Sequence, residues 1–330
     1  MSGLREWFFL RMLGLVAHVD EPLYSPIKSA VNAWLRFRGN EREVSLGELN
    51  GDKTFYVIRE FPPSVGLAGW YDRAIGYIAR AESKGWIPVI APPEPDASSR
   101  DVGDWYSYFA APSAYAIDEV MKSRHVVFAV TQAVVHKRYN RREIDRRHRI
   151  CRLIPPKREI MAFLETRAQE VLYGMPPGRR VGAYYRGTDY KKHGDWRPFG
   201  HASVPDAEAW CDSLQEDLSR WGIAGGSADG AGVFIVTEEQ EALETIRKRF
   251  PDARFVNKER FSNFRYGVCL PQQRLANTSA FENNRLYLLD LFILSKCDYL
   301  FGTINGGLMM ALNWNGNAYR DVHILDIGVS

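Results

Sequence analysis

The stretch at residues 181–189, VGAYYRGTD, constrains this chain more than any other part of the sequence. It has the pattern of a short apolar strand that ends abruptly at Arg186-Gly187-Thr188-Asp189. An arginine supplies a permanent, fork-shaped cation, and a glycine turn exposes backbone N–H groups, so the two together suit an anion. Open α/β sheets bind ligands at the carboxyl ends of their strands. The stretch therefore predicts a parallel sheet with an anion site where this strand ends.

Apolar segments of strand length alternate with segments of helical periodicity through both halves of the chain. In the first half these segments lie at 53–59 (strand), 70–84 (helix), 86–90 (strand) and 126–130 (strand). In the second half they lie at 181–186 (strand), 206–221 (helix), 233–236 (strand), 253–256 (strand), 286–296 (helix), 299–301 (strand) and 308–313 (helix). Such alternation predicts the α/β class, with parallel strands joined through helices.

The length and one break in the chain predict two domains. A chain of 330 residues exceeds the usual size of a single hydrophobic core. The helical pattern that ends near Leu172 is followed by the segment 174–178, GMPPG, which suits a boundary. We therefore expect an N-terminal domain at 1–174 and a C-terminal domain at 175–330.

The net charge and the cysteines indicate which partners and which cellular compartment to expect. The formal net charge is only +3, so bulk electrostatics give no case for a nucleic-acid partner. The four cysteines are scattered, at Cys151, Cys211, Cys269 and Cys297, without the spacing of a metal site. Free thiols in a reducing cytoplasm are the expectation.

The N-terminal residues 7–16, WFFLRMLGLV, are apolar but are broken by Arg11 and are too short to span a bilayer. They also lack the usual cleavage site of a signal peptide. A packed N-terminal helix is one interpretation, and a helix lying on a membrane surface is the other. The predicted location is the cytoplasm, with peripheral contact at the inner face of the membrane as the open alternative.

A basic run at 137–152 includes Arg141, Arg142, Arg146, Arg147 and Arg149. A solvated helix face is one interpretation of this run. Contact with an anionic membrane or with a phosphorylated acceptor is the other. The sequence leaves the choice open.

Three strands of the second half end in polar or glycine-rich turns. These turns are Arg186-Gly187-Thr188-Asp189, Thr237-Glu238-Glu239 and Thr303-Ile304-Asn305-Gly306-Gly307. In a parallel sheet they converge on one crevice. The third turn leads directly into a helix, whose N-terminus favours phosphate. Together with Arg186, this arrangement predicts a clamp for a diphosphate.

Absent motifs exclude some alternatives. The chain has no G-x-x-x-x-G-K-[ST] loop, and Gly66 and Gly69 follow a strand without completing a G-x-G-x-x-G pattern. These absences argue against a P-loop kinase and a dinucleotide-dependent dehydrogenase. No Asp-x-Asp pair occurs either. A transferase with a nucleotide-diphosphate donor would then neutralise its leaving group with protein cations, and we expect no metal.

These motifs resemble those of the GDP-fucose-dependent fucosyltransferases, which include α1,2-, α1,6- and protein O-fucosyltransferases. The peptide 185–189, YRGTD, is similar to their basic motif, and 233–239, VFIVTEE, is similar to their second motif. The segment 290–300 with Thr303 is similar to their third motif. Gly66 and Gly69 echo the family's glycine loop, and 104–109, DWYSYF, resembles a segment of bacterial relatives linked to surface polysaccharide.

The resemblance implies the GT-B fold, in which two Rossmann-like domains face each other, and an inverting reaction that needs no metal. The C-terminal domain would bind the donor and the N-terminal domain the acceptor. Arg186 matches the arginine that contacts the donor diphosphate, and Gly187 and Thr188 adjoin it. Thr237 and Glu238 match positions that contact the nucleoside. Asp290, Ser295 and Thr303 match the motif that lines the donor pocket.

Two positions depart from the family pattern. Gly187 stands where many members have a second basic residue, and Tyr184 stands where several have histidine. Both departures bear on whether the donor is GDP-fucose or another nucleotide sugar.

The expected function is transfer of fucose from GDP-fucose to a hydroxyl of a glycan acceptor, which could be lipid-linked. No cofactor is expected beyond the donor substrate. Arg186 would stabilise the leaving diphosphate with Asn305, Gly306 and Gly307. Asp189 and Glu60 are the candidate bases, with Glu238 behind them. The alternative is a non-catalytic nucleotide- or glycan-binding protein on the same fold.

Overall fold

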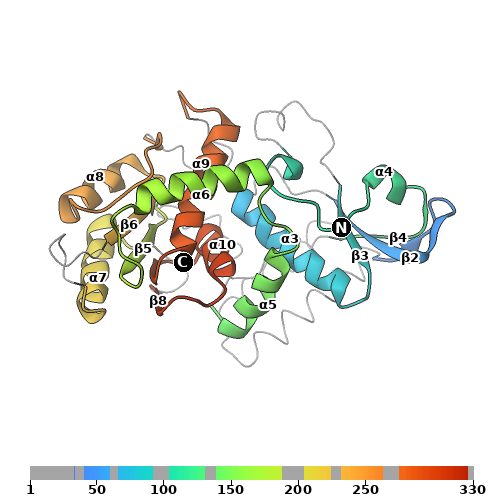
Figure 1. Ribbon diagram of the computed structural model, residues 1–330, viewed down its shortest axis with the longest axis horizontal. Helices are drawn as coiled ribbons and strands as arrows, with labels where there is room; N and C mark the ends of the chain where they lie inside the picture. Colours follow the sequence, from blue (N-terminus) through green and yellow to red (C-terminus); the bar gives the residue numbers. More distant parts are fainter. Residues whose placement is uncertain are drawn as a thin grey trace, which may run out of the picture.

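A computed structural model describes residue 33 and residues 41–59, 66–91, 104–130, 139–187, 204–223, 232–262 and 275–325 (Figure 1). The N-terminal apolar segment and three candidate site residues, Glu60, Thr188 and Asp189, lie outside the described residues. The predictions made for them stay predictions.

The described chain forms two α/β halves, each around a four-stranded sheet (Figure 1). The strands are β1 (Glu43–Val44), β2 (Leu49–Ile58), β3 (Ile87–Ile90), β4 (Ser123–Phe128), β5 (Arg180–Tyr185), β6 (Gly232–Thr237), β7 (Tyr299–Gly302) and β8 (Asp321–Ile324). The helices are α3 (Leu67–Glu82), α4 (Ile117–Val120), α5 (Arg141–Cys151), α6 (Arg158–Leu172), α7 (Ala207–Arg220), α8 (Gln240–Arg249), α9 (Ala280–Ser295) and α10 (Gly306–Asn315), with a short 3₁₀ turn η1 at Trp105–Ser107.

The first sheet has the order β1-β4-β2-β3. β2 pairs in parallel with both β3 and β4, and the two-residue β1 adds an antiparallel edge. The unit β2–α3–β3 is the βαβ unit that the sequence predicts. Its strands are buried because Phe55, Tyr56, Val57 and Ile58 face packed helices or side chains on both sides.

The second sheet has the order β6-β5-β7-β8 and is parallel throughout. β5 lies between β6 and β7, so the strand that carries the Arg186 turn is central. Two sheet-bearing α/β halves in one chain confirm the predicted class and are the architecture expected of a GT-B fold. The assignment of acceptor and donor domains at 1–174 and 175–330 stays a prediction.

Helix α10 joins the two halves. It is buried almost all round, as expected for a helix with apolar residues on every side. It packs against α9 of its own half and against α3 and α5. Near its end, Trp314 donates its indole N–H to the Tyr71 hydroxyl of α3 at 3.0 Å. One core of buried residues therefore continues from the first half into the second.

Two sequence predictions need correction. The strand expected at 253–256 is reduced to a single bridge between Phe234 and Arg254, because the chain then turns into an irregular segment. The helix expected at 286–296 begins earlier, at Ala280, where the Ser279 hydroxyl accepts a hydrogen bond from the Glu282 N–H. The polar first turns of this helix hide its start from an argument based on apolar spacing.

Within the described ranges, no helix combines the length and apolar character that a bilayer crossing requires.

Candidate functional site

The carboxyl ends of β5, β6 and β7 lie next to one another. Tyr184 of β5 pairs with Val236 of β6 on one side and with Gly302 of β7 on the other. The chain leaves the sheet just after these positions, so the three predicted turns meet at one edge. We call the residues Arg186, Thr237, Glu238 and Thr303, with the start of α10, the second-sheet edge.

Arg186 lies against a buried carboxylate at this edge. Its Nη1 is 3.6 Å from Oε2 of Glu238, and the two side chains are only 12% and 7% exposed. The other oxygen of Glu238, Oε1, accepts a hydrogen bond of 2.6 Å from the Tyr184 hydroxyl. Burial, and after it the charge of Glu238, raises the pKa of Tyr184 well above its usual range, so the hydroxyl keeps its proton and stays a donor. Glu238 is thus fixed beside Arg186.

A second buried ion pair lies near the edge. The sequence motifs included one member, Asp290, but not the other, Lys258. Lys258 donates to Oδ2 of Asp290, and both side chains are almost fully buried. Burial raises the pKa of the Asp290 carboxyl, while the Lys258 ammonium acts against that shift. Asp290, which was expected to line the donor pocket, has this salt-bridge partner within the protein, and its predicted role at the donor stays a prediction.

Arg260 holds the irregular segment that carries Lys258 against the end of β6. Its guanidinium donates to the carbonyl oxygens of Val256 and Lys258 in its own segment and of Thr237 in β6. Burial lowers the pKa of Arg260. Neither Lys258 nor Arg260 falls in a periodic stretch or a motif, so only their position in space links them to Glu238.

The turn after β7 presents a hydroxyl and a helix N-terminus. Asn305 caps α10, because its Oδ1 accepts from the Leu308 N–H at 3.0 Å and its Nδ2 donates to the Thr303 carbonyl at 2.9 Å. The hydroxyl of Thr303 is buried and has no hydrogen-bond partner among the described residues. A buried polar group without a partner is costly, so this hydroxyl is available to a ligand that would complete its hydrogen bonding.

Two glycines at this edge lie in close approach to neighbouring side chains. A Cβ at Gly307 would lie 2.5 Å from the Tyr287 hydroxyl and 2.6 Å from Cε1 of Tyr184. A Cβ at Gly187 would lie 2.0 Å from Oε2 of Glu239. The carboxylate of Glu239 thus lies beside the backbone at the position where related motifs carry a second cation.

The remaining predicted residues lie elsewhere. The Ser295 hydroxyl donates to the Phe292 carbonyl at the carboxyl end of α9, just before β7 begins, so the structure does not bring it to the second-sheet edge. Gly66 precedes α3 and Gly69 lies in its first turn, so both belong to the first half. Their predicted donor contacts remain predictions.

Among the residues that the structure describes, no group of three or more His, Cys, Asp or Glu side chains could hold a metal ion. The expectation of a metal-independent reaction stays a prediction. Chemically, the edge offers one guanidinium, one hydroxyl and the N–H groups that open α10, which together can bind a phosphate-containing ligand.

Comparison with known proteins gives structural likenesses only. No family model and no curated protein sequence matches the chain. It is similar to the fucosyltransferase NodZ from Bradyrhizobium, at 13% identity over 84% of this chain and 98% of that one, with a TM-score of 0.47. It is also similar to a variant of Arabidopsis thaliana FUT1 in complex with GDP, at 9% identity over 97% and 78%, with a TM-score of 0.49. A third likeness is to POFUT1 in complex with GDP, at 9% identity over 82% and 98%, with a TM-score of 0.48. Identities and TM-scores this low assign no activity to the chain.

Proposed function

We propose that this protein is a glycosyltransferase that uses a nucleotide-diphosphate sugar and binds it at the second-sheet edge. The observation that carries the proposal is the position of Arg186 and the Thr303 hydroxyl at the ends of adjacent parallel strands, beside the N-terminus of α10. That hydroxyl is buried and has no partner within the described ranges. A cation, a hydroxyl and free helix N–H groups at one edge suit a diphosphate.

The finer proposal is that the donor is GDP-fucose and the acceptor is a glycan hydroxyl. Its support is the order of the three motifs, which resembles that of the GDP-fucose fucosyltransferases. The proposed reaction is a single displacement that inverts the anomeric carbon. The acceptor oxygen bonds to C1 of the sugar as the bond from C1 to the diphosphate oxygen breaks, and the electron pair leaves on the diphosphate.

Arg186 is proposed to stabilise the charge that develops on the leaving diphosphate, with the turn at 303–307 beside it. A protein base takes the proton of the acceptor hydroxyl. Asp189 and Glu60 are the proposed bases, and Glu238 is the third candidate. Glu238 already accepts from Tyr184 and lies beside Arg186, which suits it better to positioning that arginine than to proton transfer.

One observation favours the second candidate function, a non-catalytic nucleotide-binding protein. Glu238 lies beside the cation of Arg186, and the carboxylate of Glu239 lies beside the backbone of Gly187. A donor with a doubly charged diphosphate gains less there than at a site with two cations.

The test is thermal unfolding of the purified full chain with GDP, UDP, ADP, CMP or dTDP, each with EDTA present, followed by GDP-fucose. The proposal expects selective stabilisation by GDP and loss of that stabilisation in Arg186→Ala. Selectivity for another nucleotide would keep the transferase and reject fucose. Stabilisation by GDP without release of GDP from GDP-fucose, over a panel of glycan acceptors, would favour the non-catalytic function.

A further inference from the structure

The basic run of the sequence divides between two faces of α5. Arg147 points inward, with a side chain only 12% exposed. Arg142, Arg146, Arg149 and Arg152 lie outward and are exposed. Their spacing of four, three and three residues places them on one face of the helix and its last turn. We call these four residues the arginine stripe.

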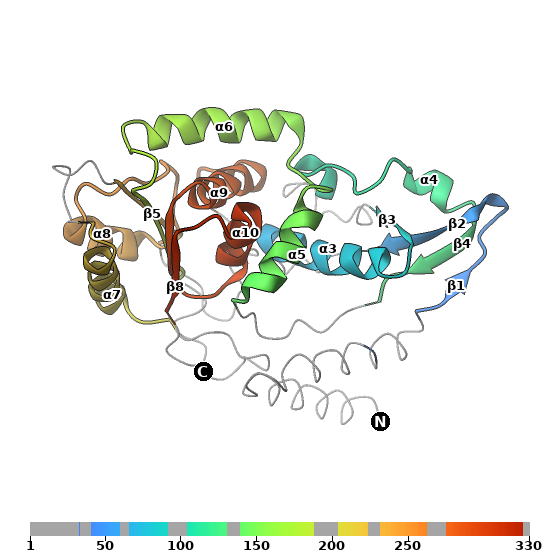
Figure 2. The ribbon, with the colours of Figure 1, turned by 60° about the horizontal axis from the view of Figure 1, so that its bottom comes forward.

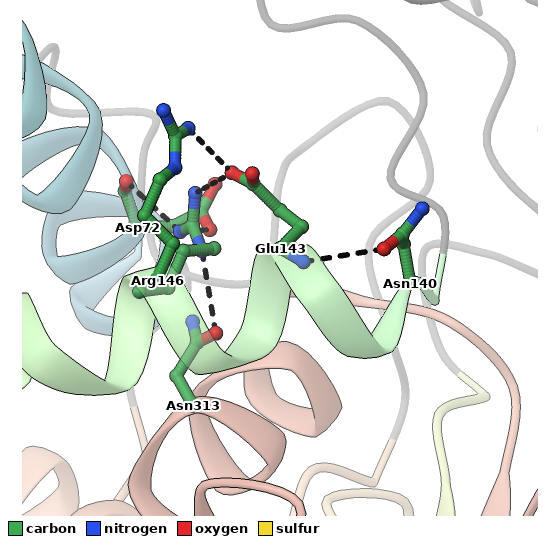
Figure 3. Close-up of polar contacts among 6 residues, drawn as sticks. Asp72, Asn140, Glu143, Arg146 and Asn313 are labelled. Atoms are coloured by element: carbon green, nitrogen blue, oxygen red, sulfur yellow. Dashed lines mark hydrogen bonds and ion pairs between the residues drawn. The ribbon is translucent and has the colours of Figure 1, made fainter.

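The inward face fixes α5 rigidly to both halves. Arg147 pairs with Asp72 of α3 and donates from Nε to Oδ1 of Asn313 in α10 at 3.2 Å. His148 contacts the Asn313 carbonyl at 2.8 Å through its Nδ1. Figure 3 shows Asp72, Glu143 and Arg146 close together beside α5, Asn313 on the neighbouring helix, and Asn140 capping the start of α5. The stripe is therefore held on a rigid element rather than on a loop.

The stripe keeps a surplus of positive charge. Arg146 pairs with Glu143 at 2.9 Å and Arg149 with Glu82 at 3.0 Å, and both arginines remain more than half exposed. Asp145, the other carboxylate of α5, accepts from Asn317. Over the described part of the chain, Arg142 and Arg152 form no ion pair, although Arg152 contacts His148 at 3.4 Å. Lys84 adds an exposed cation at the end of α3, the helix that also carries Glu82.

The linear arrangement of the arginine stripe indicates what kind of ligand it can bind. From Arg142 to Arg152 the stripe extends about 15 Å along α5. A single phosphate is held by donors that converge on one point, whereas these guanidinium groups lie along a line. Leu153 follows Arg152 directly and is 41% exposed, which adds an apolar side chain at one end of the stripe. Figure 2 shows α5 at the front of the molecule, between α3 of the first half and β8 of the second.

We propose that the arginine stripe of α5 is a docking surface for a membrane rich in anionic lipid headgroups. Several negative charges in a plane match a line of exposed guanidinium groups, and each basic side chain near such a surface strengthens binding about fivefold. The proposal does not depend on the reaction or on the donor, since it concerns a different face from the second-sheet edge.

The test is sedimentation of the full chain with vesicles of phosphatidylcholine alone or with about 30 mol% phosphatidylglycerol. The stripe variant is Arg142→Glu/Arg152→Glu. Its matched control is Arg124→Glu/Arg158→Glu, which changes the net charge equally at two exposed arginines off the stripe. Equal unfolding temperatures would show that both variants fold. If Arg142→Glu/Arg152→Glu does not fold, the milder double variant Arg142→Gln/Arg152→Gln replaces it.

We expect wild-type protein and control to bind the anionic vesicles and not the neutral ones, and the stripe variant to bind at least about tenfold more weakly. Binding should weaken steeply when salt rises from about 0.1 M to about 1 M. Equal losses in the two double variants would overturn the proposal in favour of net charge alone. No preference for anionic vesicles would also overturn it, as would vesicle binding abolished by millimolar inorganic pyrophosphate, which would indicate a phosphate-binding point.

Discussion

The two parallel sheets of this chain end differently at their carboxyl edges. In the described part of the first sheet, β2 leads to Arg59, an exposed cation whose guanidinium lies 3.8 Å from the centre of the Phe128 ring. The carbonyl of Ile90, at the end of β3, accepts from the Tyr106 hydroxyl at 2.6 Å. At the second-sheet edge, a cation and a carboxylate are buried together, and a threonine hydroxyl has no partner among the residues that the structure describes.

The difference shows how a ligand site is distinguished from an ordinary sheet end. At the first edge, the described Arg59 side chain is exposed and stacked and the Ile90 carbonyl is hydrogen-bonded, so these two groups are satisfied without a ligand. Among the described residues of the second-sheet edge, the buried Thr303 hydroxyl has no hydrogen-bond partner, and such burial costs free energy. That cost is expected where a charged ligand completes the site.

Substitution of Arg186 should give the largest functional change. Arg186→Ala removes the cation opposite the diphosphate, and we expect turnover of the nucleotide-sugar donor to fall by about 10²–10³-fold. The measurement is release of nucleotide diphosphate under single-turnover conditions. Arg59→Ala is the control, because it removes a cation from the first edge and should leave the rate of nucleotide release unchanged. Equal losses in the two variants would remove the distinction between the edges.

Substitution of Lys258 should give the largest loss of stability. Lys258→Met leaves Asp290 buried without its cation, and we expect the free energy of unfolding in urea to fall by about 3–5 kcal/mol. Lys258→Met/Asp290→Leu should recover most of that loss. Arg146→Gln, which breaks an exposed pair, should cost less than about 1 kcal/mol.

The loss in Lys258→Met should depend on pH with a definite sign. Burial already raises the pKa of Asp290 in the folded protein above its ordinary value of 3.8. A carboxyl with a raised folded-state pKa supports folding at low pH and loses that contribution as pH rises through the folded-state pKa. Removing Lys258 raises this pKa further. The gap between variant and wild type should therefore be wide at pH 7 and narrow toward pH 4, and a gap that widens on acidification would contradict the assignment.

Each sheet edge has a hydrogen-bonded tyrosine, so the same substitution can be compared at the two edges. Tyr184→Phe leaves Oε1 of the buried Glu238 without its donor and should cost about 1–3 kcal/mol of stability and weaken GDP binding. Tyr106→Phe removes a hydroxyl that donates to a carbonyl at the first edge, so it should cost about 1 kcal/mol and leave GDP binding unchanged. Calorimetric titration with GDP and urea unfolding separate the two effects. GDP binding that is weakened equally by both would show that the tyrosine acts only through general stability.

Substitution of Thr303 should have the smallest effect on stability. Thr303→Val removes a hydroxyl that has no partner in the described protein, so the unfolding free energy should change by less than about 1 kcal/mol. GDP affinity should nevertheless fall about fivefold, which corresponds to one lost hydrogen bond. Ser295→Ala is the comparison, since its hydroxyl bonds within α9 and lies away from the edge. Wild-type GDP affinity in Thr303→Val would show that this hydroxyl does not contact the nucleotide.

Local sequence patterns predicted much of this fold because the periodicity of strands and helices depends only on residues close together in the chain. β5, β6, α7 and the start of α10 lie where apolar spacing and turn residues placed them. β8 was missed, since Asp321–Ile324 is a half-exposed edge strand without a clear apolar pattern. The segment 253–256 was predicted as a strand because it is apolar, but only Arg254 forms a bridge. An apolar run does not ensure a pairing partner.

The site was predictable only in part. Arg186 and Thr303 follow strands, so parallel pairing brings them together by rule. Lys258 and Arg260 belong to an irregular segment, and their partners, Asp290 and the Thr237 carbonyl, are distant in sequence. The role of Tyr184 was also hidden, because a buried hydroxyl that donates to Glu238 has the same sequence pattern as any core tyrosine.

The most direct test of the central claim is amide hydrogen exchange of the full chain with and without GDP. If the second-sheet edge binds the nucleotide diphosphate, exchange should slow at Arg186 and Gly187, at 237–239 and at the first turn of α10. Strand β4, which carries no predicted donor contact, should change little with the nucleotide. Protection confined to the first half, or no protection anywhere at saturating GDP, would contradict the account.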